Sequence, residues 1–277
     1  MGTSLKGRTV VMSGGSRGIG LAILTAAARE GANAVFLAKT DTPDPRLPGT
    51  VHTAVAEIEA AGGSAVAVVG DVRDQADVER AVATALDRFG GVDICVNNAG
   101  ALDVRGTEEL PLKRFDLMQS INTRGTFALT RACLPYLKRS DHAHILTLSP
   151  PLNLAPRWLG AHPGYTLSKY GMTLLTLGWA AEFADHGIAA NCLWPQTMIA
   201  TAAVSNVLGG ESASRSRSPE IMADAALAVL SRPPHEQTGE TLVDADVLVE
   251  AGVTDLARYG GGRDPEFDLF VDPPLTG

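Results

Sequence analysis

The chain has 277 residues, of which 45% are hydrophobic and 19% are charged. This composition excludes a disordered chain, and the length suits one large α/β domain over residues 1–277. The formal net charge of −8 leaves no basic excess to neutralise phosphates, so nucleic acid is not expected as a main partner.

Apolar strand-like segments alternate with helical segments along most of the chain. Strands are predicted over residues 8–13, 33–38, 64–69, 92–96, 143–148, 188–193 and 240–243. Helices are predicted over residues 21–30, 50–61, 74–89, 112–139 and 219–230, with another that carries Tyr165 and ends near residue 184. The strands are nearly continuous apolar runs, as in parallel sheets that are covered on both faces. This pattern predicts an α/β, three-layer doubly wound Rossmann fold with a seven-stranded parallel sheet.

Localisation signals and metal-binding patterns are missing from the sequence. No stretch reaches the ~20 apolar residues of a membrane span, and the N-terminus leads into a strand-like run without a secretory signal. The three cysteines lie in apolar runs, which indicates buried thiols in a reducing compartment. The six histidines are scattered. We therefore expect a cytoplasmic protein with no membrane span and no metal site.

Glycine and polar residues collect where the predicted strands end. In chain order these positions are the turn Gly14-x3-Gly18-x-Gly20, then Lys39, Asp71, Asn97 to Gly100, Ser149 and Pro195. Ligands of open α/β sheets bind beyond the carboxyl ends of the strands. Each position alone is also typical of an ordinary turn, but six of them at one rim favour a common binding site.

The first of these turns is suited to the pyrophosphate of a dinucleotide, because small residues let backbone N–H groups and a helix N-terminus approach it. Many dinucleotide folds place an acid after the second strand, which holds the adenosine ribose and repels a 2′-phosphate. Ala38 occupies that position here, Lys39 follows it, and Arg17 adds a positive charge in the first turn. These residues favour NADP, with NAD possible. The alternative is that Lys39 is a solvated loop residue.

Tyr165 and Lys169 stand four residues apart, so they share one face if the segment is helical. An ammonium beside a phenol favours the phenolate and lowers the pKa of tyrosine from about 10. The pair on its own is more typical of a packed tyrosine and a solvated lysine. Its place after the fifth strand, with Ser149 at the end of that strand, favours an acid–base pair.

As a set, these motifs resemble the short-chain dehydrogenase/reductase family over about residues 7–250. The motifs that carry the resemblance are Ser13 to Gly20, Asp71, Asn97 to Gly100, Asn122, Ser149 and Tyr165-x3-Lys169. The chain is similar more narrowly to the hydroxysteroid dehydrogenase-like branch, without the sterol-carrier domain of that branch. This narrower similarity rests on Ala38-Lys39-Thr40, Asn122 to Thr126, Ser149 to Leu154, Trp194-Pro195 and Thr201 to Ala203. One departure is Gln196, which stands where the family has a glycine.

The resemblance implies roles for individual residues. Tyr165 would be the general acid/base, and Lys169 would lower its pKa and bind the nicotinamide ribose. Ser149 would donate a hydrogen bond to the substrate oxygen, and Asn122 would hold a water of a proton relay. The implied cofactor-binding residues are Gly14, Gly15, Ser16, Arg17, Gly18, Ile19, Gly20, Lys39, Asp71, Val72, Asn98, Ala99, Gly100, Tyr165, Lys169, Pro195 and Thr197.

These roles imply an NADP-dependent oxidoreductase that interconverts an alcohol and a carbonyl on a largely apolar small molecule. The alternative is a non-catalytic dinucleotide-binding sensor or scaffold on the same fold. Residues 152–163 and 201–218 are expected to wall the substrate pocket, with Leu154, Trp158, Leu159 and Trp194 making it apolar. Residues 201–218 are predicted to be a mobile lid, and residues 256–277 a tail without an assigned role.

The helix that carries Tyr165 predicts an oligomer. From Tyr165 to Ala181 its one charged residue is Lys169. A helix that is apolar nearly all round is covered on more than one side. We therefore expect a homodimer or homotetramer, with this helix and the helix over 112–139 at an interface.

Overall fold

Seven parallel strands form a single sheet in the order β3-β2-β1-β4-β5-β6-β7. The computed structural model describes residues 4–44, 49–201 and 214–273. Its strands are β1 (Thr9–Ser13), β2 (Asn33–Ala38), β3 (Ser64–Val69), β4 (Ile94–Asn97), β5 (His144–Thr147), β6 (Ala189–Trp194) and β7 (Thr241–Val243). The strand order reverses direction between β1 and β4. Ligands of such sheets bind in the crevice beyond the carboxyl ends of the two strands at this point. The predicted doubly wound, seven-stranded parallel fold is confirmed.

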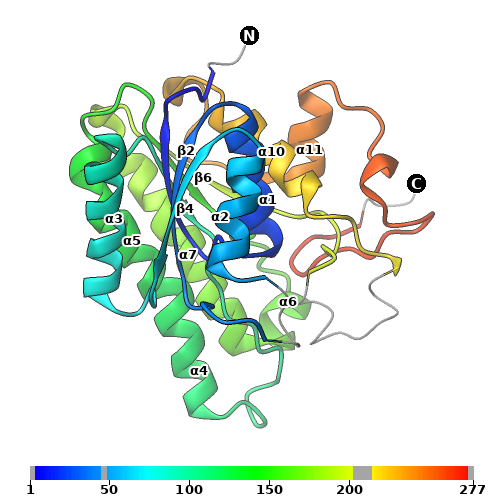
Figure 1. Cartoon of the computed structure of the whole chain (residues 1–277). Helices are drawn as coiled ribbons and strands as arrows, with labels where there is room; N and C mark the ends of the chain where they lie inside the picture. Colours follow the sequence, from blue (N-terminus) through cyan, green and yellow to red (C-terminus); the bar gives the residue numbers. More distant parts are fainter. Residues whose placement is uncertain (1–3, 45–48, 202–213, 274–277) are drawn as a thin grey trace.

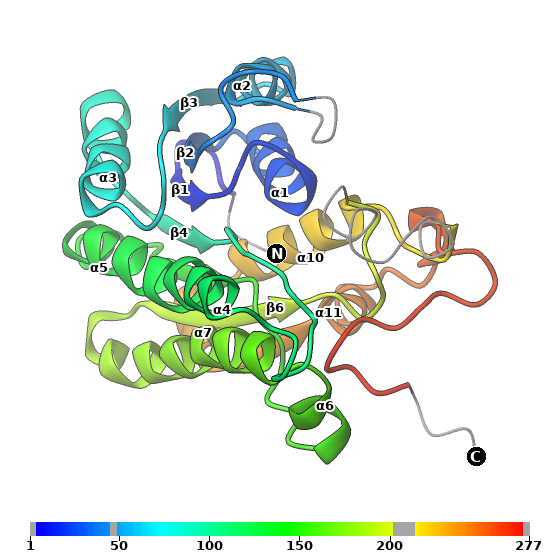
Figure 2. The same ribbon diagram turned by 90° about the horizontal axis from the view of Figure 1, so that it is seen from below.

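Helices cover both faces of the sheet and complete the three layers, as Figures 1 and 2 show. One face carries α1 (Gly18–Arg29), α2 (Val51–Ala60), α10 (Glu220–Leu230) and α11 (Asp244–Glu250). The other face carries α3 (Gln75–Phe89), α5 (Gly125–Leu137) and α7 (Pro163–Glu182). Successive residues of a strand point to opposite faces, so Val10 and Met12 join one apolar core and Val11 joins the other. This double burial explains why the strands are continuous apolar runs.

Local sequence signals set the ends of several helices. Thr50 precedes α2 and forms a reciprocal cap, in which Thr50 Oγ1 accepts from Thr53 N and Thr53 Oγ1 accepts from Thr50 N. Asp74 caps α3 by accepting from Ala76 N at 2.8 Å. Gly90 ends α3 in a left-handed conformation with φ of 83°. Thr50 and Asp74 thus begin helices that follow strands, and Gly90 ends the helix that leads to β4.

The predicted helix over 112–139 is divided in the structure. It consists of α4 (Leu112–Met118), a π-helical turn (Gln119–Arg124) and α5. Two helices were not predicted, α6 (Pro156–Ala161) and α11. Both are short and follow other elements closely, so neither shows a full helical period in the sequence. Short 3-10 turns occupy Ala184–His186, Pro234–Glu236 and Ala257–Tyr259.

The C-terminal segment returns to the carboxyl edge of the sheet, which Figure 1 shows in red. Phe267 forms an antiparallel bridge with Thr197, just after β6. The indole Nε1 of Trp194 donates to Leu269 O at 2.9 Å. The predicted tail is therefore packed against the region that follows β6 as far as the described residues extend.

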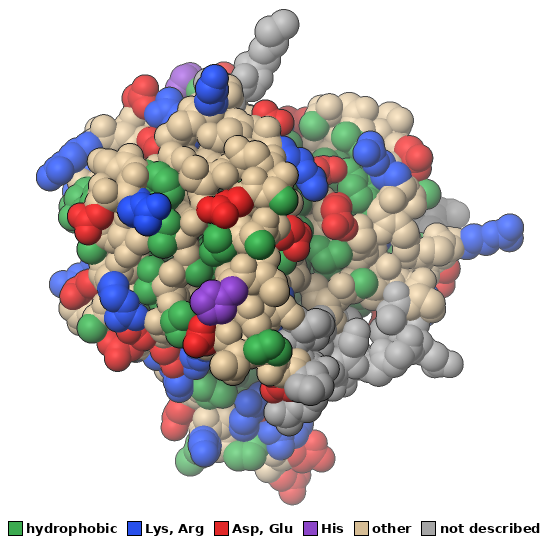
Figure 3. Space-filling view, in the orientation of Figure 1, with side chains coloured by type: hydrophobic (Ala, Val, Ile, Leu, Met, Phe, Trp, Pro, Cys, Tyr) green, Lys and Arg blue, Asp and Glu red, His purple; other side chains and the backbone are tan. Residues whose placement is uncertain are grey.

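On the face shown in Figure 3, basic side chains are interspersed with acidic ones. None of the helices in the described ranges is long and apolar enough to cross a bilayer. Most of the predicted lid, residues 202–213, lies outside the described residues.

Candidate functional site

The glycine-rich turn between β1 and α1 packs tightly against the end of β4. Gly14 has φ of 76°, and a Cβ atom there would lie 2.9 Å from Asn98 Nδ2. Asn98 Nδ2 donates to Gly14 O at 2.8 Å, and Ser13 Oγ accepts from Ala99 N at 3.1 Å. A side chain at Gly14 would therefore push the turn away from β4. Hydrogen bonds of the Asn98 amide and the Ser13 hydroxyl hold this turn against the end of β4.

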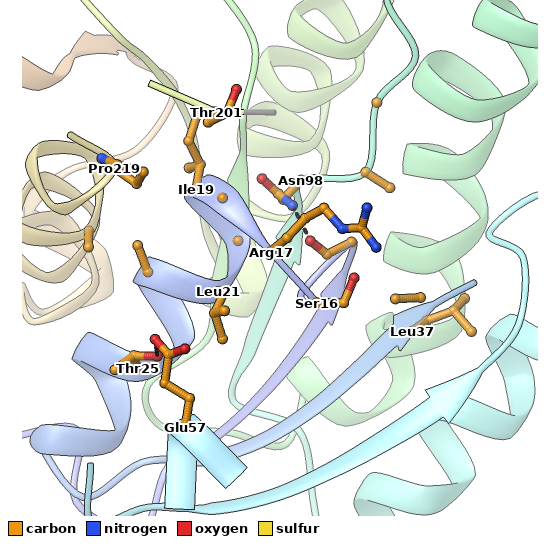
Figure 4. Close-up of a pocket in the computed structure, with 18 of the residues that line it drawn as sticks. Ser16, Arg17, Ile19, Leu21, Thr25, Leu37, Glu57, Asn98, Thr201 and Pro219 are labelled. Carbon is orange, nitrogen blue, oxygen red and sulfur yellow. Dashed lines mark hydrogen bonds between the residues drawn. The ribbon is translucent and has the colours of Figure 1, made fainter. Parts of the chain in front are cut away.

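A cleft of about 680 Å³ opens above this turn. Figure 4 shows Arg17 and Ile19 from the turn, Asn98 from the end of β4, and Thr201 and Pro219 around it. The predicted cofactor residues that line the cleft are Gly14, Ser16, Arg17, Gly18, Ile19, Gly20, Lys39, Asp71, Val72, Asn98, Ala99 and Gly100. The cleft has the backbone cradle and the helix N-terminus that a dinucleotide pyrophosphate needs.

Two predicted cofactor residues line neither this cleft nor the adjoining cavity that contains Tyr165. A Cβ atom on Gly15 would lie 2.7 Å from Leu24 Cδ1 and 2.7 Å from Phe36 Cβ, so Gly15 faces the core under the turn. Thr197 is buried, and its Oγ1 has no hydrogen-bond partner within the described ranges. Its backbone pairs with Phe267. The resemblance to the family had implied that both residues bind the cofactor.

Positive charge surrounds one carboxylate at the adenosine end of the cleft. Lys39 Nζ and Arg73 Nη2 each lie 2.6 Å from Asp71 Oδ2. Partial burial opposes ionisation of Asp71, but hydrogen bonds from Arg73 and Lys39 hold its pKa well below the usual range. Arg17 Nη2 donates to Gly49 O at 2.9 Å. Arg17, Lys39 and Arg73 therefore lie near the end of β2, and two of these three cations pair with Asp71.

Tyr165 and Lys169 lie one turn apart on α7 and line a second cavity of about 280 Å³. Lys169 Nζ donates to Leu148 O at 2.7 Å and lies 4.8 Å from the ring centroid of Trp194. The Tyr165 ring stacks on Phe270, with centroids 6.1 Å apart. The helix prediction and the shared face of this pair are confirmed.

The expected electrostatic effect of Lys169 on Tyr165 is wrong for this structure. Burial, followed by the nearby carboxyl of Asp268, raises the pKa of Tyr165 instead of lowering it. Burial also lowers the pKa of Lys169 to about 8. The two side chains share a cavity, and the Lys169 ammonium donates to the backbone carbonyl of Leu148.

Ser149 and Asn122 are both completely buried. Ser149 follows β5, and its Oγ has no hydrogen-bond partner in the described part of the chain, although the thiol of Cys192 is nearby. Asn122 lies in the π-helical turn, where its Oδ1 accepts from Ala101 N at 2.7 Å and its Nδ2 donates to Ser168 Oγ at 2.9 Å. The side chain of Asn122 thus ties α7 to the segment after β4.

The second cavity joins the cleft, because Ile19, Asn98, Gly100 and Thr201 line both. Its other lining residues are Ala101, Leu102, Val104, Leu148, His162, Tyr165, Lys169, Trp194, Pro195, Met198, Ile199, Asp268 and Leu269. Most are apolar, as predicted for a substrate pocket. The arrangement brings a buried phenol and an ammonium beside the end of a dinucleotide cleft.

Among the residues that the sequence analysis missed are three from the C-terminal segment. Asp268 and Leu269 line this cavity, and Phe270 packs on Tyr165, Tyr170 and Trp194. The signal that could have found them is the run Phe-Asp-Leu-Phe-Val at 267–271, an apolar cluster after a glycine-rich turn. The residues that were expected to wall the substrate pocket differ in their positions. Trp194 lines the cavity, whereas Leu154 and Leu159 are exposed.

Comparisons with known proteins agree with this geometry. The family model described as short chain dehydrogenase matches residues 8–210. Hydroxysteroid dehydrogenase-like protein 2 of Xenopus tropicalis is 51% identical over 271 residues. That match covers 97% of this chain and 64% of the relative, so the chain spans less than two thirds of the relative's length.

Solved structures are similar over nearly the whole chain. A short chain dehydrogenase of Mycobacterium thermoresistibile is 54% identical, with a TM-score of 0.92 and coverage of 98% of this chain and 99% of that one. A blue fluorescent protein from a metagenomic library, solved in complex with NADPH, is 28% identical with a TM-score of 0.74. That match covers 87% of this chain and 97% of the neighbour. The chain therefore belongs to the short-chain dehydrogenase family of oxidoreductases, and its predicted likeness to the hydroxysteroid dehydrogenase-like branch is confirmed.

Proposed function

We propose that this chain is an NADP-dependent oxidoreductase that interconverts an alcohol and a carbonyl on a largely apolar small molecule. One observation carries the proposal: Tyr165 and Lys169 line an apolar cavity that joins the glycine-lined cleft. The fit to a dinucleotide is supported by the turn itself, since Cβ atoms at Gly14 or Gly20 would fill the space next to Asn98. The solved neighbour with NADPH adds support for this class of cofactor.

The residues of this chain would divide the chemistry between them. When bound, the nicotinamide supplies or accepts the hydride. Tyr165 gives a proton to the carbonyl oxygen during reduction and removes it from the alcohol during oxidation. The resemblance to the family gives Ser149 as the donor to the substrate oxygen, although its buried Oγ lies near the Cys192 thiol and does not line the cavity in this structure. Lys169 would hold the nicotinamide ribose and favour the phenolate while Tyr165 is deprotonated.

The preference for NADP is supported by the charges after β2. Lys39 and Arg17 both line the cleft, and the residue that would repel a 2′-phosphate is replaced by Ala38. Asp71 is the one acid in this group, and it is already paired with Lys39 and Arg73. A 2′-phosphate would compete with Asp71 for the same cations.

Two other features support proposals about the location of the enzyme and its oligomeric state. The three cysteines are free and buried, which fits the reducing cytoplasm that we propose as its location. We propose a homodimer or homotetramer, because α7 exposes Leu167 and Leu174.

A panel of aldehydes, ketones and alcohols with NADPH or NADP tests the proposal. The expected result is oxidation of NADPH by at least one apolar carbonyl. The fall in the absorbance of the reduced nicotinamide measures this oxidation. Tyr165→Phe should remove this activity. The alternative function, a cofactor-binding sensor or scaffold, predicts tight NADPH binding without turnover of any panel member by the parent protein.

A further inference from the structure

Asp268 places a carboxyl group in the cavity that holds Tyr165 and Lys169. It belongs to the C-terminal segment Glu266–Asp272, beyond the residues that the family model matches. The residue is only 9% exposed and lines the cavity together with Leu269. No role in catalysis or cofactor binding follows for it from the motifs of the sequence.

The C-terminal segment is fixed firmly enough to hold this carboxyl in place. Asp268 N donates to Gln196 O at 3.0 Å. Two residues on, Phe270 is 1% exposed and adopts a left-handed conformation with φ of 71°. Such a conformation is strained for a bulky side chain and persists where the surroundings over-determine it. Asp272 then accepts from Asn153 Nδ2 at 2.9 Å and from Trp158 Nε1 at 2.8 Å.

The carboxyl of Asp268 has an unused oxygen. Its Oδ1 accepts from Leu269 N at 2.7 Å, and the group makes no ion pair and no other side-chain hydrogen bond within the described ranges. The neighbouring lining residues Leu102, Trp194 and Met198 are apolar. A buried charge without a counter-ion is strongly unfavourable, so such a carboxyl keeps its proton or awaits a partner.

The titratable groups around Asp268 agree with a neutral acid. Burial raises its pKa to about 8, against the opposing hydrogen bond from Leu269 N. The charge of Asp244 raises that pKa further, and the charge of Lys169 lowers it. A carboxyl group that keeps its proton has an O–H donor, and Asp268 lines the cavity.

We propose that Asp268 is a substrate-binding residue that donates a hydrogen bond to a second oxygen atom of a neutral substrate, away from the carbon that reacts. This rests on the proposed function, because the cavity is taken to be the substrate pocket. A substrate carboxylate would meet Asp268 as a like charge once the acid ionises. The ligand class is thus a mostly apolar carbonyl or alcohol with an additional ether, hydroxyl or carbonyl oxygen.

Matched ketones test this subsite without any reaction. Methoxycyclohexanones, with the methoxy group at each ring position, are compared with the corresponding ethylcyclohexanones. Each pair has nearly the same shape and differs in one acceptor oxygen. Dissociation constants are measured by calorimetry on protein saturated with oxidised NADP, which cannot reduce a ketone. Failure of the proposed oxidoreductase activity would appear separately, as absence of turnover with NADPH.

The expected result at neutral pH is that at least one methoxy isomer binds about 3- to 10-fold more tightly than its ethyl partner, the range of one hydrogen bond. Asp268→Leu should abolish the difference. Asp268→Asn keeps an N–H donor and should retain most of it. One pH unit above the pKa of about 8, the parent protein should lose the preference while Asp268→Asn keeps it.

The ratio within each pair cancels the titration of Lys169, since both members of a pair meet the same groups. Circular dichroism and NADP affinity show whether each variant is folded. The inference is overturned if no methoxy isomer is preferred by the parent protein. It is also overturned if folded Asp268→Leu keeps the preference.

Discussion

The side chain of Tyr165 is buried, stacks on the ring of Phe270 and lines the substrate cavity. Desolvation raises its pKa, so the phenol holds its proton at neutral pH. A protonated tyrosine is the form needed to donate to a carbonyl oxygen. At the scale of this residue, Tyr165 therefore has the protonation state that carbonyl reduction uses, and alcohol oxidation requires it to lose that proton first.

Tyr165→Phe should reduce kcat by about 10²- to 10⁴-fold, the contribution of a positioned general acid. NADPH affinity should change little, because the substitution removes one oxygen. The matched control is Tyr170→Phe on the same helix, whose hydroxyl donates to Asn153 O at 2.6 Å. That variant should lose about 1 kcal/mol of stability and keep its activity. Equal loss of kcat in both variants would contradict the assigned role of Tyr165.

Lys39→Asp should change the cofactor preference. The variant replaces a charge-assisted contact to the 2′-phosphate with repulsion, which corresponds to about a 10- to 100-fold loss of kcat/KM for NADPH. The value for NADH should stay the same or rise. Lys113→Asp, an exposed lysine of α4, is the control for charge reversal elsewhere. Initial rates with both cofactors measure the effect, and an equal loss with NADH would argue against phosphate recognition.

Asp244 should make stability depend on pH. The side chain is fully buried, and burial raises its pKa to about 6, although Gln196 N and Ala245 N donate to Oδ1. A folded-state pKa above the unfolded value near 3.9 means that ionisation opposes folding. The free energy of unfolding should therefore fall as pH rises from about 4 to about 6. Asp244→Asn should remove this part of the dependence in urea titrations, and parallel curves for the two proteins would refute it.

At the scale of elements, the conformation of the β1–α1 turn requires a close approach between Gly14 and Gly20. A Cβ atom on Gly20 would overlap Gly14 O and lie 2.5 Å from Asn98 Nδ2. Gly20→Ala should weaken NADPH binding by at least about 10-fold, since the turn must move away from β4. Gly91→Ala is the control, because a Cβ there meets nothing within 4 Å. Fluorescence titration with NADPH measures both, and unchanged affinity in Gly20→Ala would exclude this turn as the pyrophosphate site.

The elements also show where sequence reasoning works. Residues 8–13 and 33–38 were predictable as strands because both faces are buried, which leaves one continuous apolar signal. The π-helical turn around Asn122 was not, because its extra residue is stabilised by contacts with Ala101 and Ser168. Those contacts come from segments distant in sequence, and helix periodicity does not register them.

At the scale of the whole molecule, α5 and α7 leave apolar side chains uncovered. Leu167 and Leu174 are 57% and 59% exposed and stand seven residues apart, so they lie on one stripe of α7. Phe127 of α5 is 47% exposed, and its ring lies 6.4 Å from that of Trp179 on α7. An apolar stripe across two adjacent helices favours association with another copy.

The double substitution Leu167→Asp and Leu174→Asp should convert the expected dimer or tetramer to smaller species, because buried carboxylates oppose association. Leu112→Asp is the control, as this leucine is 78% exposed on α4, outside the stripe. Light scattering at micromolar concentration measures the mass. A parent protein that is monomeric under those conditions would contradict the predicted oligomer.

The sequence by itself determined the strand–helix alternation, the doubly wound topology and the rim on which Gly14, Asp71, Asn98 and Tyr165 meet. These follow from local periodicity and from strands whose carboxyl ends must share one edge. Only the tertiary structure decided that Gly15 faces the core and that Asp268 and Phe270 close the substrate side. Burial and pKa values depend on packing between segments about 100 residues apart, such as Tyr165 and Phe270, and such contacts leave no period in the chain.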